Sequence, residues 1–240
     1  MTVMTIPFTS LGGENHGWLD AKHHFSFANY HDPRRMGVGP LRVWNDDTIQ
    51  PGTGFPFHSH RDMEIITFVR DGAITHEDNL GNRGRTEAGD VQVMSAGTGI
   101  THSEFNLEDE ITRIFQIWII PDERGHKPRW DARQFPKGSR SGELVALASG
   151  REVHAGTDAL AIHADSAVLG ATLDAGQEVH HTIDQGRALY VVPAKGAVTI
   201  GDAFVDTRDG AVVTAKDGAE HVVITADLDA EIVVVDVPLT

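Results

Sequence analysis

The sequence contains no cysteine. This absence excludes disulfide bonds and thiolate metal ligands, and it agrees with a cytoplasmic location. Long apolar runs are missing too, because the run IFQIWII is interrupted by Gln116 and ends before Pro121. No segment therefore has the length that crosses a bilayer. The first residues contain neither a basic leader nor the apolar core of a secretion signal. We expect a soluble cytoplasmic protein that makes no membrane contact.

Basic side chains are few. The 240 residues include 20 Lys and Arg against 35 Asp and Glu, which gives a formal net charge of −15. A protein of this charge repels phosphate backbones, so we expect no direct contact with nucleic acid. The charge leaves a protein partner possible. The length allows one large or two small domains, each able to bury a core.

Helical periodicity is also absent, since no long stretch spaces its apolar residues as a helix does. Short β-branched runs are instead separated by clusters of Gly, Asp and Asn. The clearest runs are MEIITFV, DVQVMSA, TRIFQIWII, ALYVV, GAVTI and EIVVVDV. Their spacing favours a sandwich or small barrel over alternating strands and helices. The sequence therefore predicts an all-β protein.

A polar, basic segment with Pro and Gly, KPRWDARQFPKGSRSG, extends from Lys127 to Gly142 and is typical of a connection between domains. We place a boundary there, between an N-terminal domain of residues 1–135 and a C-terminal domain of residues 136–240. A weak internal repeat supports this division. GAIT at 72–75 followed by GDVQV at 89–93 resembles GAVT at 196–199 followed by GAVVT at 210–214. Two tandem copies of one β-domain would account for the repeat.

Two short motifs indicate a metal site. His58-Ser59-His60 closes the run GTGFPFHSH, and His102-Ser103-Glu104 closes the run SAGTGITHSE. On a strand, residues i and i+2 face the same side, so each motif places two ligand side chains on one face. If the two strands are neighbours, one ion lies between them. Three imidazoles and a carboxylate suit a first-row transition ion.

The second copy lacks this arrangement. The counterpart of the first motif falls near His180 and His181, which are adjacent and so point to opposite faces of a strand. The counterpart of the second falls at His221-Val222-Val223, which has no carboxylate. We therefore expect a metal in the first domain and none in the second.

The same residues carry a family resemblance. GTGFPFHSHRDMEIITFVRDG resembles the first cupin motif, and GTGITHSEFN resembles the second. More narrowly, FSFANYHDP, HEDNLGN, MSAGTGITHSE and QIWI resemble the pirin family of bicupins, and particularly its bacterial members with quercetin 2,3-dioxygenase activity. The specific motifs lie in residues 16–121. The resemblance implies two tandem antiparallel β-barrel (jelly-roll) domains, of which the second is degenerate and metal-free.

Carried over position by position, the family's metal ligands are His58, His60, His102 and Glu104. The resemblance implies iron as the usual ion, while the donor set also accepts Mn, Co, Ni, Cu or Zn. Glu64 occupies a position that binds metal in other cupins but not in pirins, so we leave it outside the ligand set.

Other side chains have both a structural and a functional interpretation. His76 is better explained as structural, or as support for a ligand, than as catalytic. His23 and His24 lie either at the cavity mouth or in a packed N-terminal segment. Several large apolar side chains either line an aromatic substrate pocket or pack in the core, namely Phe25, Phe27, Phe55, Phe57 and Met63.

Four protein ligands leave room on the ion for substrate or O2, which is a catalytic layout. The resemblance implies cleavage of a flavonol such as quercetin, with ring opening and release of carbon monoxide. Glu104 then acts as ligand and as general base toward the 3-hydroxyl. The alternatives are a metal-binding redox sensor that contacts a transcriptional regulator, and an isomerase or hydrolase that uses the metal without O2. A compact monomer fits each of them.

Overall fold

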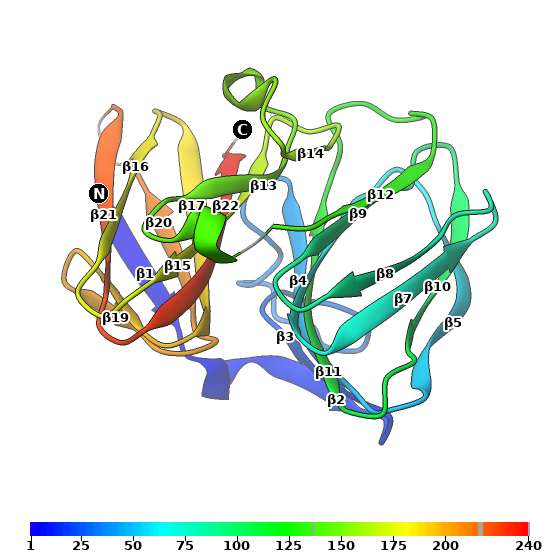
Figure 1. Cartoon of the computed structure of the whole chain (residues 1–240). Coiled ribbons are helices and arrows are strands. Elements are labelled where there is room, and N and C mark those ends of the chain that lie inside the picture. Colours follow the sequence, from blue (N-terminus) through cyan, green and yellow to red (C-terminus); the bar gives the residue numbers. More distant parts are fainter. Residues whose placement is uncertain (136, 216–217, 240) are drawn as a thin grey trace.

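A computed structural model describes residues 1–135, 137–215 and 218–239, and within them it contains 22 strands and three short 3-10 helices. The strands form two halves, each a jelly-roll-like sandwich of a seven-stranded and a four-stranded sheet (Figure 1). The expected all-β bicupin architecture is confirmed, although each sandwich is open at its edges rather than closed into a barrel. The 3-10 helices are η1 (Phe8–Ser10), η2 (Lys137–Arg140) and η3 (Glu152–His154).

The N-terminal half consists of two antiparallel sheets. Its larger sheet has the order β12 (Arg129–Arg133), β9 (Val91–Ser95), β6 (Glu64–Asp71), β11 (Thr112–Ile119), β4 (Leu41–Ile49), β3 (Leu19–His23) and β2 (Gly12–Asn15). Its smaller sheet has the order β5 (Thr53–His60), β10 (Ile100–Asn106), β7 (Ala73–Asp78) and β8 (Arg83–Glu87).

The C-terminal half repeats this plan. Its larger sheet has the order β1 (Thr2–Ile6), β20 (Gly210–Thr214), β17 (Arg187–Lys195), β22 (Ala230–Pro238), β15 (Ala167–Leu173), β13 (Val145–Ser149) and β14 (Leu160–Ala161). Its smaller sheet has the order β16 (Glu178–Ile183), β21 (Glu220–Ala226), β18 (Val198–Ile200) and β19 (Ala203–Val205). The short β13–β14 pair is parallel and the other pairs are antiparallel.

The internal repeat detected in the sequence corresponds to matching strands. β7 and β18 occupy the same place in the two small sheets, as β9 and β20 do in the two large ones. The glycines that precede β7 and β18, Gly72 and Gly196, both have φ = 71°, in the left-handed region that favours glycine. At Gly196 a Cβ atom would also lie 2.2 Å from the Asp229 carbonyl oxygen. The two turns are therefore equivalent in conformation as well as in sequence.

The two halves pack through their large sheets. One buried cluster joins Trp44, Phe68 and Phe115 of the N-terminal half to Tyr190 and Val235 of the C-terminal half. Figure 1 shows β4 and β11 beside β17 and β22 at the centre of the molecule. The large sheets are thus covered on both faces, by the other half on one side and by their own small sheet on the other.

The interiors of the two sandwiches differ. In the C-terminal half one continuous apolar cluster, which includes Leu169, Leu189 and Ile224, fills the space between the sheets. In the N-terminal half the apolar residues form two smaller clusters, one around Ile114 and one around Met94. Polar side chains lie between these clusters. The N-terminal half therefore has room for a site within its sandwich, as described below.

The segment expected to connect the domains is partly a strand. Residues Arg129–Arg133 form β12, which pairs with β9 at the edge of the large N-terminal sheet. Residue 136 lies outside the described residues. The boundary near residue 135 stays a prediction. Within the described residues, no helix is both long and apolar enough to span a membrane.

Candidate metal centre

The two predicted motifs lie on neighbouring strands. β5 pairs with β10 so that His102 faces His58 and Ile100 faces His60. Between His102 and Glu104 the register shifts, and Glu104 faces Phe55. Two residues of β5, Pro56 and Phe57, therefore oppose one residue of β10, which is the geometry of a β-bulge. Proline suits this place because it has no N–H to give to a strand ladder.

The bulge also fixes the orientation of His58. Its Nδ1 atom lies 2.8 Å from the Pro56 carbonyl oxygen, which can only accept a hydrogen bond. Nδ1 therefore carries the proton, and Nε2 is left with a free lone pair. A ligating histidine is normally held in this way by a hydrogen bond at its other nitrogen.

Three imidazoles converge. One ring nitrogen each of His58, His60 and His102 lies within 4.8 Å of the other two. The rings of His58 and His102 have centroids 4.5 Å apart. Burial, together with the neighbouring histidines, lowers the pKa of His102 to about 2, and burial lowers the pKa of His60 to about 4. Both rings are therefore neutral near pH 7, which is the form that binds metal.

A relay of hydrogen bonds holds His102. Its Nδ1 atom lies 3.3 Å from Nδ1 of His76, and Nε2 of His76 lies 3.0 Å from Oδ2 of Asp78. His76 is fully buried and stacks on Trp130 with an interplanar angle of 7°. The expected role of His76 as support for a ligand agrees with these contacts. The Nε2 atom of His102 is buried and has no hydrogen-bond partner among the described residues. An orphaned nitrogen of this kind fits a metal ligand.

Glu104 is buried and its carboxylate accepts three hydrogen bonds. Oε1 accepts from Gln92 Nε2 at 2.7 Å and from Thr67 Oγ1 at 3.2 Å, and Oε2 accepts from Gln116 Nε2 at 2.8 Å. Both amides are themselves oriented, since Thr86 donates to Gln92 Oε1 and Trp118 donates to Gln116 Oε1. Burial raises the pKa of Glu104 to about 7, although these hydrogen bonds oppose the shift. A nearby cation would favour the ionised form.

The three donors to Glu104 belong to a row of polar side chains across the large sheet. His23, Asn45, Gln116, Thr67 and Gln92 lie directly opposite one another on β3, β4, β11, β6 and β9. We call this set the polar row. It separates the two apolar clusters of the N-terminal interior and faces the small sheet that carries the histidines.

The structure does not gather all four predicted ligands into one group. His58, His60 and His102 form one set of mutually close ligand atoms, and His76, His102 and Glu104 form a second set. His102 is common to both. Both ring nitrogens of His76 already take part in hydrogen bonds. In the second set, Glu104 is therefore a better candidate than His76 for a metal ligand beside His102.

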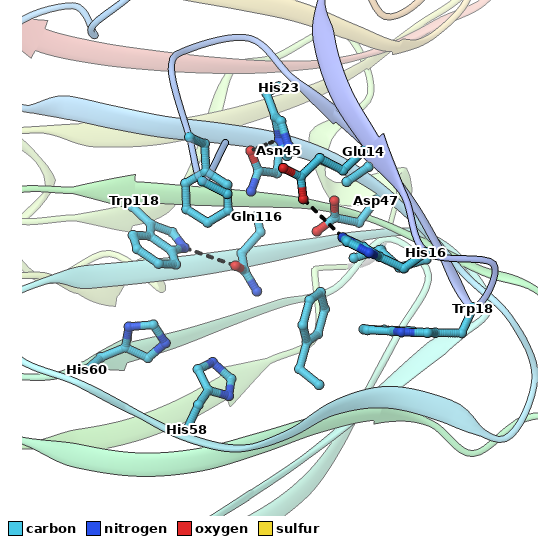
Figure 2. A pocket seen from close by; sticks show the side chains of 15 residues that line it. Glu14, His16, Trp18, His23, Asn45, Asp47, His58, His60, Gln116 and Trp118 are labelled. Carbon is cyan, nitrogen blue, oxygen red and sulfur yellow. Dashed lines mark hydrogen bonds and ion pairs between the residues drawn. The ribbon is translucent and has the colours of Figure 1, made fainter. Parts of the chain in front are cut away.

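A cavity of about 340 Å³ adjoins the histidines. Apolar atoms make up most of its lining surface, although about half of the lining residues are polar, and His58 and His60 lie at one side (Figure 2). Polar groups occupy the opposite side, where Figure 2 shows His23, Asn45, Asp47, Glu14 and His16. A mostly apolar cavity with a few convergent polar groups is the usual form of a small-molecule site, and this volume lies at the lower end of the usual range.

The other candidate side chains divide between cavity and core. Phe27 and Phe55 line the cavity with His23, whereas Phe25 packs between the two halves. Met63 packs against the cluster around Met94, and Phe57 is 57% exposed on the outer surface.

His24 and Glu64 lie away from the three imidazoles. His24 is buried at the boundary between the halves, where its Nδ1 atom lies 2.8 Å from the Tyr190 hydroxyl. Glu64 is buried and accepts a hydrogen bond from Ser95, and it belongs to neither ligand group among the described residues.

In the C-terminal half, the contacts of His180 and His181 agree with the prediction that these two side chains point to opposite faces of their strand. His181 points inward, with Nε2 2.8 Å from Oδ2 of the buried Asp236. His180 is exposed and lies 3.1 Å from His221. Neither belongs to a group of three ligand-type side chains within the described residues.

Sequence reasoning missed the residues that orient Glu104 and most of those that line the cavity. Thr67, Gln92 and Gln116 are single polar residues within apolar strands. That interruption is the signal that could have identified them.

The family comparisons agree over nearly the whole chain. Residues 7–119 match the family model described as Pirin, and residues 147–237 match the model described as Quercetinase C-terminal cupin domain. A pirin-like protein of Caulobacter vibrioides is 60% identical over 96% of this chain and 97% of its own length. The quercetin 2,3-dioxygenase of Escherichia coli K12 is 40% identical over 95% of each chain.

A solved structure shows the same fold. The crystal structure of the bacterial pirin YhhW from Escherichia coli in complex with nickel(II) superposes with a TM-score of 0.91 at 38% identity, and the match covers 100% of both chains.

Proposed function

Because this chain belongs to the pirin family, we propose that it is a metal-dependent dioxygenase that cleaves a flavonol such as quercetin with O2. The observation that carries the proposal is the convergence of three imidazoles beside a mostly apolar cavity, with a buried carboxylate next to His102. The name of the Escherichia coli relative supports the same reaction. The physiological flavonol, a cytoplasmic location and a monomeric state remain predictions.

We infer that His58, His60, His102 and Glu104 hold one divalent transition ion. The donor set suits such an ion, because neutral imidazoles and a carboxylate bind first-row metals. The lone pair on His58 Nε2 and the orphaned His102 Nε2 support the assignment. Iron is the ion that the family resemblance implies, and Mn, Co, Ni, Cu or Zn would fit the same donors. The nickel(II) complex of the Escherichia coli pirin supports a metal in this fold.

The residues around the ion would have separate roles in the reaction. When bound, the ion supplies Lewis acidity that lowers the pKa of a substrate hydroxyl beside a carbonyl. Glu104 would accept the proton of that hydroxyl at a carboxylate oxygen. Gln92 and Gln116 hold the carboxylate in place by their hydrogen bonds. Phe55 and Trp118 line the cavity and exclude water from the substrate ring. The overall reaction adds both atoms of O2, opens the central ring and releases carbon monoxide.

Oxygen consumption with quercetin tests the proposal, with wild-type protein of known metal content beside the variants His58→Ala and Glu104→Gln. We expect His58→Ala to lose metal and activity together. Glu104→Gln should retain part of the metal but lose about 100-fold or more in turnover, because general-base catalysis contributes about 100- to 10,000-fold. His31→Ala is the control, since His31 is exposed and outside the cavity.

Undiminished turnover in Glu104→Gln would contradict the base role. Absence of oxygen uptake by wild-type protein loaded in turn with iron, manganese, nickel and copper would contradict the enzyme proposal. A metal-binding redox sensor with a protein partner would then become the leading function. Activity that persists without oxygen would instead indicate an isomerase or hydrolase.

A further inference from the structure

The side of the cavity opposite the histidines contains two buried polar atoms without partners. Among the described residues, Nε2 of His23 and Oδ1 of Asp47 are buried and make no hydrogen bond. Both residues line the cavity and both are at most 2% exposed. More than nine in ten buried polar groups in proteins are hydrogen-bonded, so two orphaned groups at one cavity wall call for a cause. A ligand that supplies the missing hydrogen bonds is such a cause.

The hydrogen bonding of His23 defines what it can bind. Its Nδ1 atom lies 2.8 Å from Oδ1 of Asn45, the acceptor oxygen of that amide, so Nδ1 donates. Burial lowers the pKa of His23, which keeps the ring neutral at pH 7. The Nε2 atom then has a lone pair and accepts a hydrogen bond. A hydroxyl group of a ligand is a suitable donor.

Asp47 is a buried acid without a cationic partner among the described residues. It lies on β4 opposite Ala21 of β3 and Ile114 of β11. Burial, reinforced by the charges of Asp46 and Glu104, outweighs the opposing charge of Arg70 and raises the pKa of Asp47 well above its usual value. A protonated carboxyl group both donates and accepts hydrogen bonds. It therefore pairs with a neutral hydroxyl group.

His23 and Asp47 lie across the cavity from His58 and His60, with aromatic side chains between them (Figure 2). We propose that His23 and Asp47 bind phenolic hydroxyl groups of the substrate at the cavity wall opposite His58 and His60, and thereby select polyhydroxylated aromatic compounds. This inference rests on the proposed function, because it assumes that the substrate occupies this cavity.

A pair of substrates tests the inference. Quercetin carries hydroxyl groups on both outer rings, whereas 3-hydroxyflavone keeps only the hydroxyl beside the carbonyl. We expect His23→Phe and Asp47→Leu to lower kcat/KM for quercetin by about 10-fold or more. A site that binds a substrate hydroxyl group loses much of its kcat/KM when the hydrogen-bonding partner is removed. For 3-hydroxyflavone the change should stay below about 3-fold. Asp47→Asn, which retains hydrogen-bonding capacity, should preserve most of the preference for quercetin.

Matched controls separate this effect from unfolding. Asp20→Leu changes an acid on the same sheet whose side chain is 45% exposed, and His31→Phe changes an exposed histidine. Thermal melting of every metal-loaded variant checks that it is folded. Equal losses for the two substrates in folded His23→Phe and Asp47→Leu would overturn the recognition role while leaving the dioxygenase intact.

Binding without turnover distinguishes the two proposals. If wild-type protein consumes no oxygen with either compound, the dioxygenase proposal fails, and calorimetry on the metal-loaded protein without oxygen still tests the recognition role. Weaker binding of quercetin by the two variants, with unchanged binding of 3-hydroxyflavone, would support it. Unchanged binding of both compounds would refute it.

Discussion

At the scale of single residues, the site depends on which nitrogen of each histidine is free. His58 is fixed by the Pro56 carbonyl, and His102 is fixed by His76. His76 itself is fixed by Asp78, which also accepts hydrogen bonds from the backbone of Leu80 and Asn82. The orientation of a buried ligand is thus set by a turn at the surface of the small sheet.

This relay predicts the behaviour of His76 variants. His76→Phe removes the acceptor for His102 Nδ1, so metal affinity should fall by about 10- to 100-fold although no proposed ligand is altered. His76→Asn places an oxygen near the lost nitrogen and should recover part of the affinity. Competition titration with a chromogenic chelator measures both values. An affinity equal to that of wild type in folded His76→Phe would contradict the role of the relay.

At the scale of secondary-structure elements, the site residues on the two sheets of the N-terminal half could not be predicted equally well from the sequence. In the small sheet, both ligand motifs could be predicted because each pair of ligand side chains lies two residues apart on a single strand, β5 or β10. The centre of the large sheet is covered on both faces, and its strands β6, β9 and β11 are therefore mostly apolar. In such a strand Gln116 appears as an interruption, and sequence alone does not reveal which face it occupies.

The same reasoning explains two further differences. β12 was expected to be part of a connection because an edge strand that is polar and bears a nearby proline resembles a loop. The polar row was missed because its members are one per strand, and only the register of five strands brings them together. Patterns within a strand could be predicted, whereas patterns across strands required the structure.

The polar row predicts a cost to stability. Gln92→Met removes a donor to the buried Glu104 carboxylate, so the free energy of unfolding of the metal-free protein should fall by about 1–3 kcal/mol. Denaturant titration measures the change. Gln134→Met, at an exposed position, is the matched control and should change the value by less than about 0.5 kcal/mol. Equal effects of the two substitutions would contradict a stabilising role for the hydrogen bond from Gln92.

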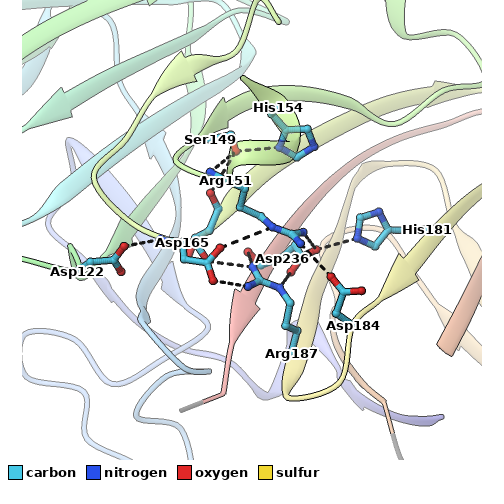
Figure 3. Close-up of polar contacts among 10 residues, drawn as sticks. Asp122, Ser149, Arg151, His154, Asp165, His181, Asp184, Arg187 and Asp236 are labelled. Carbon is cyan, nitrogen blue, oxygen red and sulfur yellow. Dashed lines mark hydrogen bonds and ion pairs between the residues drawn. The ribbon is translucent and has the colours of Figure 1, made fainter. Parts of the chain in front are cut away.

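At the scale of the whole molecule, the two halves use their interiors differently. The C-terminal interior is filled with apolar side chains, and a cluster of charged groups surrounds the buried Asp236 (Figure 3). Asp236 accepts hydrogen bonds from Arg187 at 2.7 Å and Arg151 at 2.6 Å, and His181 lies 2.8 Å away. The cavity beside the three imidazoles therefore has no apolar counterpart between the sheets of the C-terminal half among the described residues.

The charged cluster predicts a pH dependence of stability. Burial raises the pKa of Asp236, but hydrogen bonds from His181 and Arg187 outweigh it, and the net pKa is lowered. A carboxyl group with a lowered pKa in the folded state stabilises the protein above its unfolded pKa of about 4 and loses this contribution as the pH falls further. The free energy of unfolding should therefore decrease below about pH 4.

Asp236→Asn isolates this contribution. It leaves two guanidinium groups without their buried partner, so the free energy of unfolding at pH 7 should fall by about 3–5 kcal/mol. The difference from wild type should shrink as the pH decreases below about 4. Asp184→Asn is the control, because that side chain is 60% exposed although it also contacts Arg151. A difference that does not vary with pH would contradict the assignment.

The first strand of the chain has a consequence for biosynthesis. β1 completes the large sheet of the C-terminal half at the position that β12 occupies in the other half, and Thr2 pairs with Thr214. At about 5–20 residues per second, a ribosome makes the partner strand some tens of seconds after the first one emerges. The N-terminal half can assemble during that interval while β1 waits. We therefore expect β1 to join the second sandwich only after β20 has been made, so that this pairing forms late in folding.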